Sequence, residues 1–250
     1  MIGITVCVDY HDVLAYTLPW NAPHFDLLIV VTSLQDEATC EVARRFPNVA
    51  VLQTDVFFAK GAEFNKGAAI EQALNWCSWC SGWRCLVDAD IVIPREADLN
   101  RDLEDNRLYS ACRKQCGRLD DWRKYLHAFP RGDWERWPLV HEDWFVGGAL
   151  LVFNERDLVL QQRFPVYPTH WRHAGGADTE FIEKWPREKQ RMYPWHILHL
   201  GEPRKNWFGR VTPFGDGSIP HKAEARTKRI AQMDADRTHH GFEREYVSHK

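Results

Sequence analysis

Two aspartates one residue apart, Asp88 and Asp90, follow a short apolar run at residues 85–87. Such a run is typical of a buried strand, whose interior tolerates charge only when the charge is paired or bound to a metal. Because successive side chains of a strand point to opposite faces, both carboxylates are expected on the same side. Two carboxylates at a strand end suit a hard divalent cation that also binds a phosphate. A turn in which one aspartate caps the following segment is the simpler alternative.

Apolar runs alternate with segments of helical spacing in the first part of the chain. This alternation indicates an α/β domain of Rossmann-like type, with a mostly parallel central sheet flanked by helices. In such sheets, ligands bind outside the carboxyl ends of the strands. We expect strands at residues 2–8, 25–31, 49–52 and 85–87, helices at 13–20, 36–46 and 63–76, and the strand-end residues Asp9, Thr32, Asp55 and Asp88 beside a ligand.

Composition restricts the class of protein. The chain has 250 residues and a formal net charge of -3, with 44% hydrophobic and 27% charged residues. These values are typical of a soluble globular protein and do not require a nucleic acid or an anionic membrane as partner. No apolar run approaches the ~20 residues of a membrane span. The odd count of seven cysteines and the lack of a basic, cleavable leader favour reduced thiols and a cytoplasmic location.

The pattern divides the chain into three parts. Residues 1–94 form the expected nucleotide-binding α/β half, which ends in the aspartate pair. Residues 95–220 form the half that binds an acceptor and completes the metal site, with strands expected at 108–112 and 191–200 and an irregular excursion at 119–137. Residues 221–250 form a charged, partly helical tail. The chain has no GxGxxG after its first strand and no GxxxxGK[ST], so dinucleotide and P-loop sites are disfavoured.

Three later segments add residues of the same chemical kind. Gly147 and Gly148 precede an apolar run, and residues 175–181 read GGADTEF, so that two acidic side chains lie in the first turn of an expected helix. His196 and His199 follow in an HxxH spacing. If that segment is extended, the two imidazoles face opposite sides and share a metal only where the backbone turns. The glycine pairs are otherwise simple turns, and the histidines are otherwise core or loop residues.

Together with the DxD sequence at residues 88–90, these segments resemble nucleotide-sugar glycosyltransferases of the GT-A fold. The glycine-rich segments and the histidines resemble the β-1,4-galactosyltransferase group, and the stretch from Asn65 and Lys66 to Gly67 is similar to the N-x-G loop of family 2 relatives. The resemblance covers about residues 1 to 210. It implies transfer of a sugar from a nucleotide-diphosphate sugar, such as a UDP-sugar, to an acceptor hydroxyl, with inversion and with Mn²⁺ or Mg²⁺.

The resemblance also implies roles for individual residues. Asp90 would bind the metal directly, and Asp88 would contact the ribose or reach the metal through water. His199 would be a further metal ligand and His196 a second one. Asp178 would deprotonate the acceptor hydroxyl, and the dipole at a helix start favours its charged form. The residues implied for donor binding are Asp9, Thr32, Asp55, Asn65, Lys66, Asp88, Gly147 and Gly148.

Ala177 departs from the family pattern, which often has Glu at this position, so Glu180 is the alternative base. A nucleotidyltransferase, or a nucleotide-sugar-binding protein that has lost catalysis, would carry similar carboxylates. The cysteine pairs at residues 77–80 and 112–116 permit structural zinc, although buried thiols explain them more simply. The acceptor is left open: a glycan, a lipid-linked sugar, a protein side chain or a nucleobase.

Overall fold

A mixed sheet of nine strands forms the centre of the described part of the chain. The computed structural model describes residues 1–117, 121–122, 139–141, 149–161, 165–201 and 231. Along the sheet the strand order is β3-β2-β1-β4-β8-β6-β9-β5, and β7 pairs with β6. The strands are β1 Ile2–Val6, β2 Leu27–Ser33, β3 Val49–Thr54, β4 Trp83–Val87, β5 Ile91–Val92, β6 Leu108–Cys116, β7 Leu139–His141, β8 Leu150–Asn154 and β9 Gln190–Leu200.

Most of these strands share one direction. Parallel pairing joins β3, β2, β1 and β4. Strand β8 is antiparallel to both β4 and β6, so that β6 and its parallel neighbour β9 again run with β4. Only β8, β5 and β7 run the other way in the described sheet. The expected mostly parallel α/β sheet is therefore confirmed.

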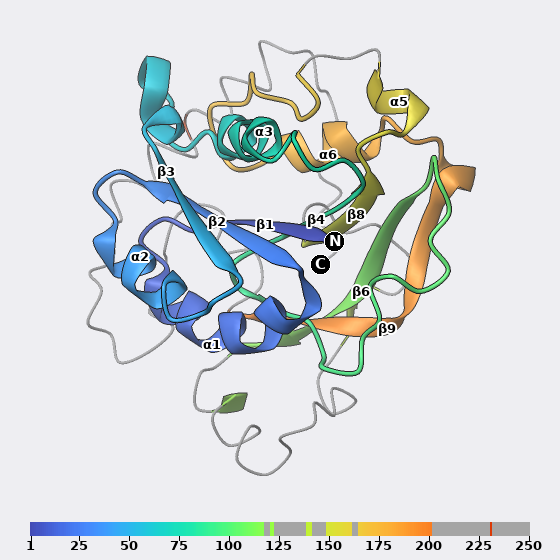
Figure 1. Ribbon diagram of the computed structural model, residues 1–250, viewed down its shortest axis with the longest axis horizontal. Coiled ribbons are helices and arrows are strands. Elements are labelled where there is room, and N and C mark those ends of the chain that lie inside the picture. Colours follow the sequence, from blue (N-terminus) through green and yellow to red (C-terminus); the bar gives the residue numbers. More distant parts are fainter. Residues whose placement is uncertain (118–120, 123–138, 142–148, 162–164, 202–230, 232–250) are drawn as a thin grey trace.

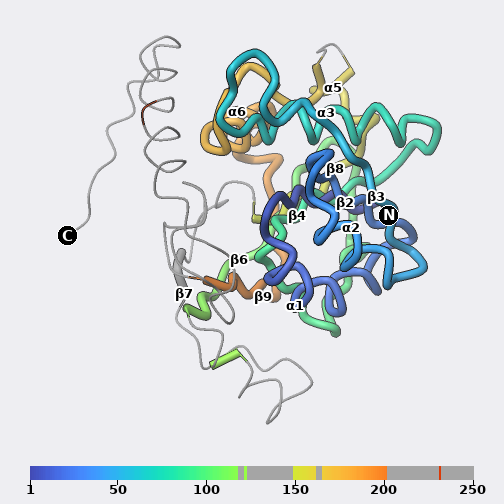
Figure 2. The backbone as a smooth tube through the Cα atoms, turned by 90° about the vertical axis from the view of Figure 1, so that its left-hand side faces the viewer, coloured from blue at the N-terminus to red at the C-terminus, as the bar shows by residue number. Residues whose placement is uncertain are grey.

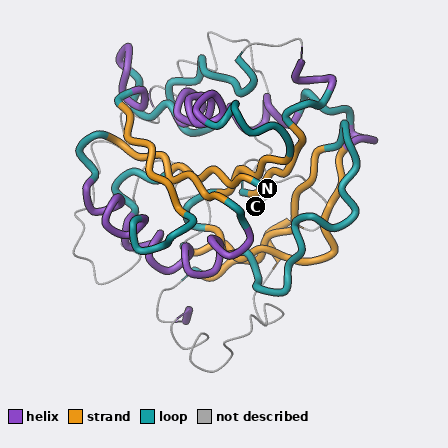
Figure 3. Tube along the Cα trace, in the orientation of Figure 1, coloured by secondary structure: helices purple, strands orange, loops and turns teal. Residues whose placement is uncertain are grey.

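Helices cover both faces of the parallel strands (Figures 1 and 3). In the view of Figure 1, α3 and α6 lie above the sheet and α1 and α2 lie below it. The helices, including the short 3-10 turns η1 to η3, are α1 His11–Asn21, η1 Ala22–His24, α2 Glu37–Ala43, η2 Val56–Gly61, α3 Lys66–Trp76, α5 Leu158–Gln161, α6 Ala177–Ile182 and η3 Arg187–Lys189.

Strand residues alternate between two hydrophobic cores. Ile29 and Leu86 pack with the residues of α3 and α6, whereas their neighbours Val30 and Val87 pack with those of α1 and α2. Each of these four side chains is at most 3% exposed. Because both faces are covered, the strands are apolar at nearly every position, which is the pattern that the sequence shows.

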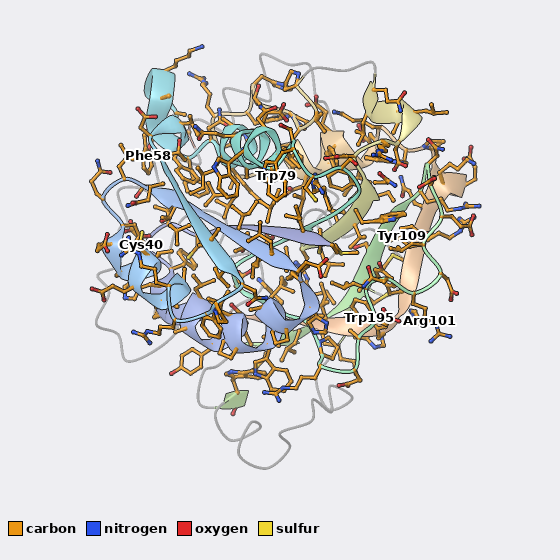
Figure 4. The ribbon with its side chains drawn as sticks, viewed as in Figure 1. Cys40, Phe58, Trp79, Arg101, Tyr109 and Trp195 are labelled. Carbon is orange, nitrogen blue, oxygen red and sulfur yellow. The ribbon has the colours of Figure 1, made fainter. Side chains whose placement is uncertain are left out.

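The second half of the sheet is built on the long pairing of β6 with β9 (Figure 2). Strand β6 reaches Cys116, beyond the expected end at residue 112, and its register with β9 is continuous from Cys112 to Cys116. Aromatic residues pack beside this pairing: the rings of Tyr193 and Trp195 stack at 4.6 Å, and Tyr109 lies against Tyr193 at 5.6 Å (Figure 4).

Some predictions fall on residues that the structure does not describe. These are Gly147 and Gly148, nearly all of the excursion at 119–137 and nearly all of the tail at 221–250. The division of the chain into three parts stays a prediction. Among the described helices, none is long and apolar enough to cross a membrane.

Candidate active site

The two aspartates of the DxD sequence lie in a turn between β4 and β5. Asp88 follows the last residue of β4, and the amide of Ile91 donates to the Asp88 carbonyl at 3.1 Å. A turn directs the two side chains to different partners, whereas a strand would align them. The Asp88 carboxylate is bonded to Lys66, and the Asp90 carboxylate is bonded to His199. The side chain of Asp88 is 34% exposed and that of Asp90 is 12% exposed.

Lys66 joins Asp88 to the predicted base, Asp178. Its Nζ lies 2.7 Å from Asp88 Oδ1 and 3.1 and 3.3 Å from the two oxygens of Asp178. The Lys66 side chain is 11% exposed and that of Asp178 is 14% exposed, so that this pair is largely shielded from water, whereas Asp88 is partly exposed. Burial lowers the pKa of Lys66, but attraction by Asp178 and Asp88 outweighs this effect, and the pKa lies above its usual value. The ammonium therefore remains charged.

Burial raises the pKa of Asp88 to about 6, although Lys66 acts to lower it. Repulsion by Asp178 and Asp90 adds to the rise. Asp178 and Asp90 thus both lie close enough to affect the charge of Asp88. Neighbouring carboxylates of this kind favour the arrival of a cation.

Each residue of the N-x-G stretch, Asn65 to Gly67, has a structural role. Asn65 caps α3 by accepting from the Ala68 amide at 2.8 Å, and it donates to the carbonyl of Thr169 at 2.8 Å. A Cβ atom at residue 67 would lie 1.9 Å from the carbonyl oxygen of Pro168, so only glycine fits. The start of α3 is therefore held against the segment that leads into α6, and this contact places Lys66 between Asp88 and Asp178.

Asp90 and His199 form the second part of the site. The pairing of β5 with β9 sets Ile91 opposite His199, and Asp90 Oδ2 lies 2.9 Å from His199 Nε2. On the other side of the ring, His199 Nδ1 lies 2.8 Å from Gln115 Oε1. The Gln115 amide is oriented by its own donation to the backbone carbonyls of His199 and Gly201. Because Oε1 can only accept, this network assigns a proton to Nδ1 and leaves Nε2 facing Asp90.

The structure does not bring His196 to this pair. The register of β9 with β6 is regular through this stretch, and residues three apart on a strand point to opposite faces. Burial, together with repulsion by Lys114, lowers the pKa of His196 and favours its neutral form. Among the described residues, no group of three or more His, Cys, Asp or Glu side chains is arranged to hold a metal. Of the predicted metal ligands, the structure brings Asp90 and His199 into contact, with Asp88 close enough to Asp90 to be affected by its charge.

The two candidate bases occupy different surroundings. Asp178 is bonded to Lys66 and accepts from the hydroxyl of Tyr167, and its side chain is 14% exposed. Glu180 accepts from the indole of Trp171 at 2.8 Å, pairs with His170 at 3.1 Å and is 32% exposed. Of the two, only Asp178 is connected to the aspartate pair.

The predicted nucleotide-pocket residues Asp9 and Thr32 are tied together by Asp36. This buried carboxylate accepts from the Asp9 amide at 2.8 Å and from the Thr32 hydroxyl at 3.1 Å, while it also caps α2. Thr32 is fully buried, so its side chain supports the strand end and does not face a ligand. Asp9 is exposed and has the left-handed φ of 58°. Asp55 is exposed at the start of η2.

Sequence reasoning missed Gln115 and Tyr167, which orient His199 and Asp178. Gln115 was missed because the polar run at 113–115 ended the expected strand at residue 112. Tyr167 lies in an irregular segment, and periodicity gives no signal there. Parity along a longer β6 would have identified Gln115, since it is aligned with His199 in the parallel register.

No family model and no curated protein matches the chain. Solved structures with a similar course of the backbone include the WbbM bifunctional glycosyltransferase, at 13% identity and a TM-score of 0.43, covering 94% of this chain and 44% of that one. Glucosyl-3-phosphoglycerate synthase from Mycobacterium tuberculosis, solved with Mn²⁺, UDP and phosphoglyceric acid, matches at 16% identity and a TM-score of 0.47, covering 81% and 72%. The inositol-1-phosphate CTP transferase from T. maritima matches at 8% and 0.45, covering 81% and 89%.

Glycosyltransferases are thus among the solved structures that the chain is similar to, as its motifs predict. The chain spans less than half the length of the WbbM structure. A similarity of this degree carries no argument about activity, because one fold supports many reactions. The function has to be argued from the side chains of the site.

Proposed function

We propose that the protein is a metal-dependent glycosyltransferase that moves a sugar from a nucleotide-diphosphate sugar, in the first instance a UDP-sugar, to an acceptor hydroxyl with inversion. The observation that carries the proposal is the Asp90–His199 pair, oriented by Gln115 and lying next to Asp88. Lys66 then connects Asp88 to a further carboxylate, Asp178. A cation site beside a second carboxylate is what transfer from a diphosphate to a hydroxyl requires.

The Asp90–His199 pair fits a divalent cation. In a neutral imidazole whose Nδ1 carries the proton, Nε2 is an acceptor, and it faces another acceptor, Asp90 Oδ2, at 2.9 Å. This arrangement is favourable when a proton or a cation lies with the two atoms. The two atoms are close enough for one cation to contact both, and Asp90 and His199 would hold it there. Gln115 supplies the outer contact that fixes a metal-binding histidine ring.

Two protein ligands are consistent with a cation that also binds substrate phosphates, because Mg²⁺ and similar ions keep several positions for water and phosphate oxygens. A cation bound there would neutralise the charge that develops on the departing diphosphate. Asp90 and His199 would hold it. The open edge of Asp88, bonded to Lys66 through Oδ1 alone, would face the ribose or a bound water.

Asp178 is the proposed base. Inversion requires a carboxylate on the face of the sugar opposite the leaving group, where it takes the proton of the acceptor hydroxyl. Lys66 and Tyr167 hold the Asp178 carboxylate in one orientation. Glu180 is turned towards His170 and Trp171, so that its side chain suits contact with an acceptor better than proton transfer beside the donor.

The departure at Ala177 has a packing explanation. Ala177 is fully buried, and its Cβ lies 3.6 Å from the position that a Cβ of Gly67 would occupy. A glutamate at residue 177 would have to place its carboxylate in this buried contact between α6 and α3. The small side chain therefore reflects how the two helices pack and does not favour a protein that has lost catalysis. Within the described residues, no contact favours a nucleotidyltransferase over the transfer of a sugar.

Calorimetric titration of UDP with and without Mn²⁺ tests the donor site. We expect Mn²⁺-dependent UDP binding that Asp90→Asn weakens at least ~100-fold, since a charged ligand is lost while the shape is kept. Asp102→Asn is the matched control, because Asp102 is 88% exposed and its left-handed φ of 53° suits asparagine as well. Unchanged UDP binding by Asp90→Asn would reject the cation site. A preference for GDP would retain the site and change the donor.

A second measurement separates the two bases. With a UDP-sugar and a panel of acceptors, Asp178→Asn should retain UDP binding and lose transfer by a factor of ~100 or more. Glu180→Gln should change the acceptor dependence and leave the slow hydrolysis of the donor nearly unchanged. Loss of hydrolysis in Glu180→Gln together with normal transfer in Asp178→Asn would assign the base to Glu180.

A further inference from the structure

Arg113 lies on β6, two residues before Gln115. The register of β6 with β9 is unbroken over this stretch, with Arg113 opposite Ile197 and Gln115 opposite His199. Residues two apart on a strand share a face, so the Arg113 side chain leaves the sheet on the same side as the Gln115 side chain that contacts His199. The sequence motifs give Arg113 no role, because the expected strand ended before it.

The Arg113 guanidinium is half-buried and incompletely bonded. Its Nε is enclosed by protein atoms and has no hydrogen-bond partner among the described residues. Burial lowers the pKa of Arg113, while attraction by Asp90 and Asp88 acts to raise it. In the described part of the chain, neither aspartate forms a direct ion pair with it, since Asp88 pairs with Lys66 and Asp90 with His199. The guanidinium is thus attracted to the aspartate pair and bonded to neither member.

A different arginine shows what a buried guanidinium that serves the fold looks like. Arg84, 1% exposed, donates through Nη2 to the Glu155 carboxylate at 2.5 Å and to the carbonyls of Cys77 and Cys80. A guanidinium presents five donors and keeps its charge inside a protein, so burial without acceptors is costly. The Nε atoms of both arginines lack a partner, but Arg84 has a carboxylate and two carbonyls as acceptors for Nη2. The Arg113 side chain has no ion pair or hydrogen bond with a described residue, and the charges that attract it are Asp90 and Asp88.

We propose that Arg113 binds a phosphate-type oxyanion of the substrate, in a subsite next to the Asp90–His199 cation site. The guanidinium is planar and forms paired hydrogen bonds with phosphate oxygens. A cation on one side and a guanidinium on the other would hold the same oxyanion. The oxyanion belongs either to the diphosphate of the donor or to a phosphate on the acceptor. The inference rests on the proposed function for the identity of the donor, but not for anion binding itself.

Calorimetric titrations of the full chain with Mn²⁺ test this subsite and distinguish the two sources. In the first arm, UDP and uridine are compared in the wild type, Arg113→Met and Arg113→Lys. If Arg113 contacts the diphosphate, Arg113→Met weakens UDP binding ~10- to 100-fold and leaves uridine binding unchanged. Arg113→Lys recovers part of the lost affinity, because lysine keeps the positive charge but lacks the paired N–H donors of the guanidinium. In the second arm, inorganic phosphate is titrated into the protein saturated with UDP. If Arg113→Met loses affinity for phosphate in this arm but keeps its affinity for UDP, Arg113 is assigned to an acceptor phosphate.

Arg191→Met serves as the control, since Arg191 is an exposed arginine of β9. Equal binding by wild type and Arg113→Met in both arms would overturn the inference and leave the proposed function standing. Parallel loss of UDP and uridine binding would also overturn it, because this pattern indicates a damaged fold. Wild-type protein that binds phosphate through Arg113 but no UDP would retain the subsite and reject the donor. Wild-type protein that binds neither would reject both.

Discussion

Asp88 and Asp90 are separated by one residue, yet the fold treats them differently. Asp88 is paired with a permanent cation of the protein, Lys66, which also holds Asp178. Asp90 faces an imidazole whose far side is fixed by a neutral amide. The described partner of the first aspartate is thus an ammonium, and that of the second is an imidazole, which is charged only when it is protonated. Under the proposed function, the first carboxylate shapes the site and the second binds the cation.

Removal of Lys66 should have the largest effect, because it removes the cation with which Asp88 is paired. Lys66→Met leaves Asp88 and Asp178 without their shared countercharge in a shielded place, and we expect the free energy of unfolding to fall by ~3–5 kcal/mol. Urea unfolding followed by circular dichroism measures this change. Lys189→Met, at an exposed position in η3, is the control and should change stability by less than ~0.5 kcal/mol. A loss below ~1 kcal/mol for Lys66→Met would mean that water already screens the pairs.

Loss of Gln115 should affect the contact between Asp90 and His199. Gln115→Leu removes the acceptor for His199 Nδ1, so that the ring is no longer fixed with Nε2 towards Asp90. Removal of such an outer contact costs ~10–100-fold in metal affinity. Mn²⁺ titration measures the loss, and Gln161→Leu, on the exposed surface of α5, is the control. Unchanged Mn²⁺ affinity in Gln115→Leu would show that the ring is held by other means.

The dependence of stability on pH should give the smallest effect and concerns Asp88 alone. Its pKa is raised from 3.8 to about 6 in the folded protein, so the folded state binds this proton more tightly than the unfolded state. The resulting stabilisation is complete below about pH 4 and is lost as the pH rises through about 6. Because a third of the side chain meets water, we expect only ~1 kcal/mol.

Thermal unfolding of wild type and Asp88→Asn across pH 4 to 7, without added metal, isolates this contribution. The difference in stability between the two proteins should change over this interval, with Asp88→Asn gaining relative to wild type as the pH rises. A constant difference would place the Asp88 pKa near its ordinary value, and the two aspartates would then not be distinguished by their surroundings.

The alternation of apolar strands and helices predicted the parallel half of the sheet, since residues buried on both faces give an unmistakable apolar pattern. The same reasoning ended β6 too early, because Arg113, Lys114 and Gln115 are polar. These residues are tolerated there because the strand borders a charged site, and a charged site is where sequence patterns for a buried strand fail. Both histidines were predicted as metal ligands, but only His199 contacts Asp90, because residues three apart on a strand face opposite sides.

The side-chain network of the site could not be predicted in the same way. The strand-end rule placed Asp9, Thr32 and Asp88 at one edge of the sheet, and the structure has them there. It gave no means of finding that Lys66 bridges two carboxylates 112 and 22 residues away in sequence. Such contacts depend on the close approach of α3 to the segment before α6, which requires Gly67 but leaves no periodic signal.

The pairing of β5 with β9 has a consequence for protein synthesis. Asp90 and His199 are 109 residues apart, and β9 joins the sheet after every other described strand has been made. At ~5–20 residues per second, a ribosome needs roughly 5–20 s to proceed from Asp90 to His199. During this interval the growing chain already carries the parallel strands and Lys66, but it has no means of holding a cation with both ligands. Under the proposed function, metal binding therefore marks the arrival of the last strand.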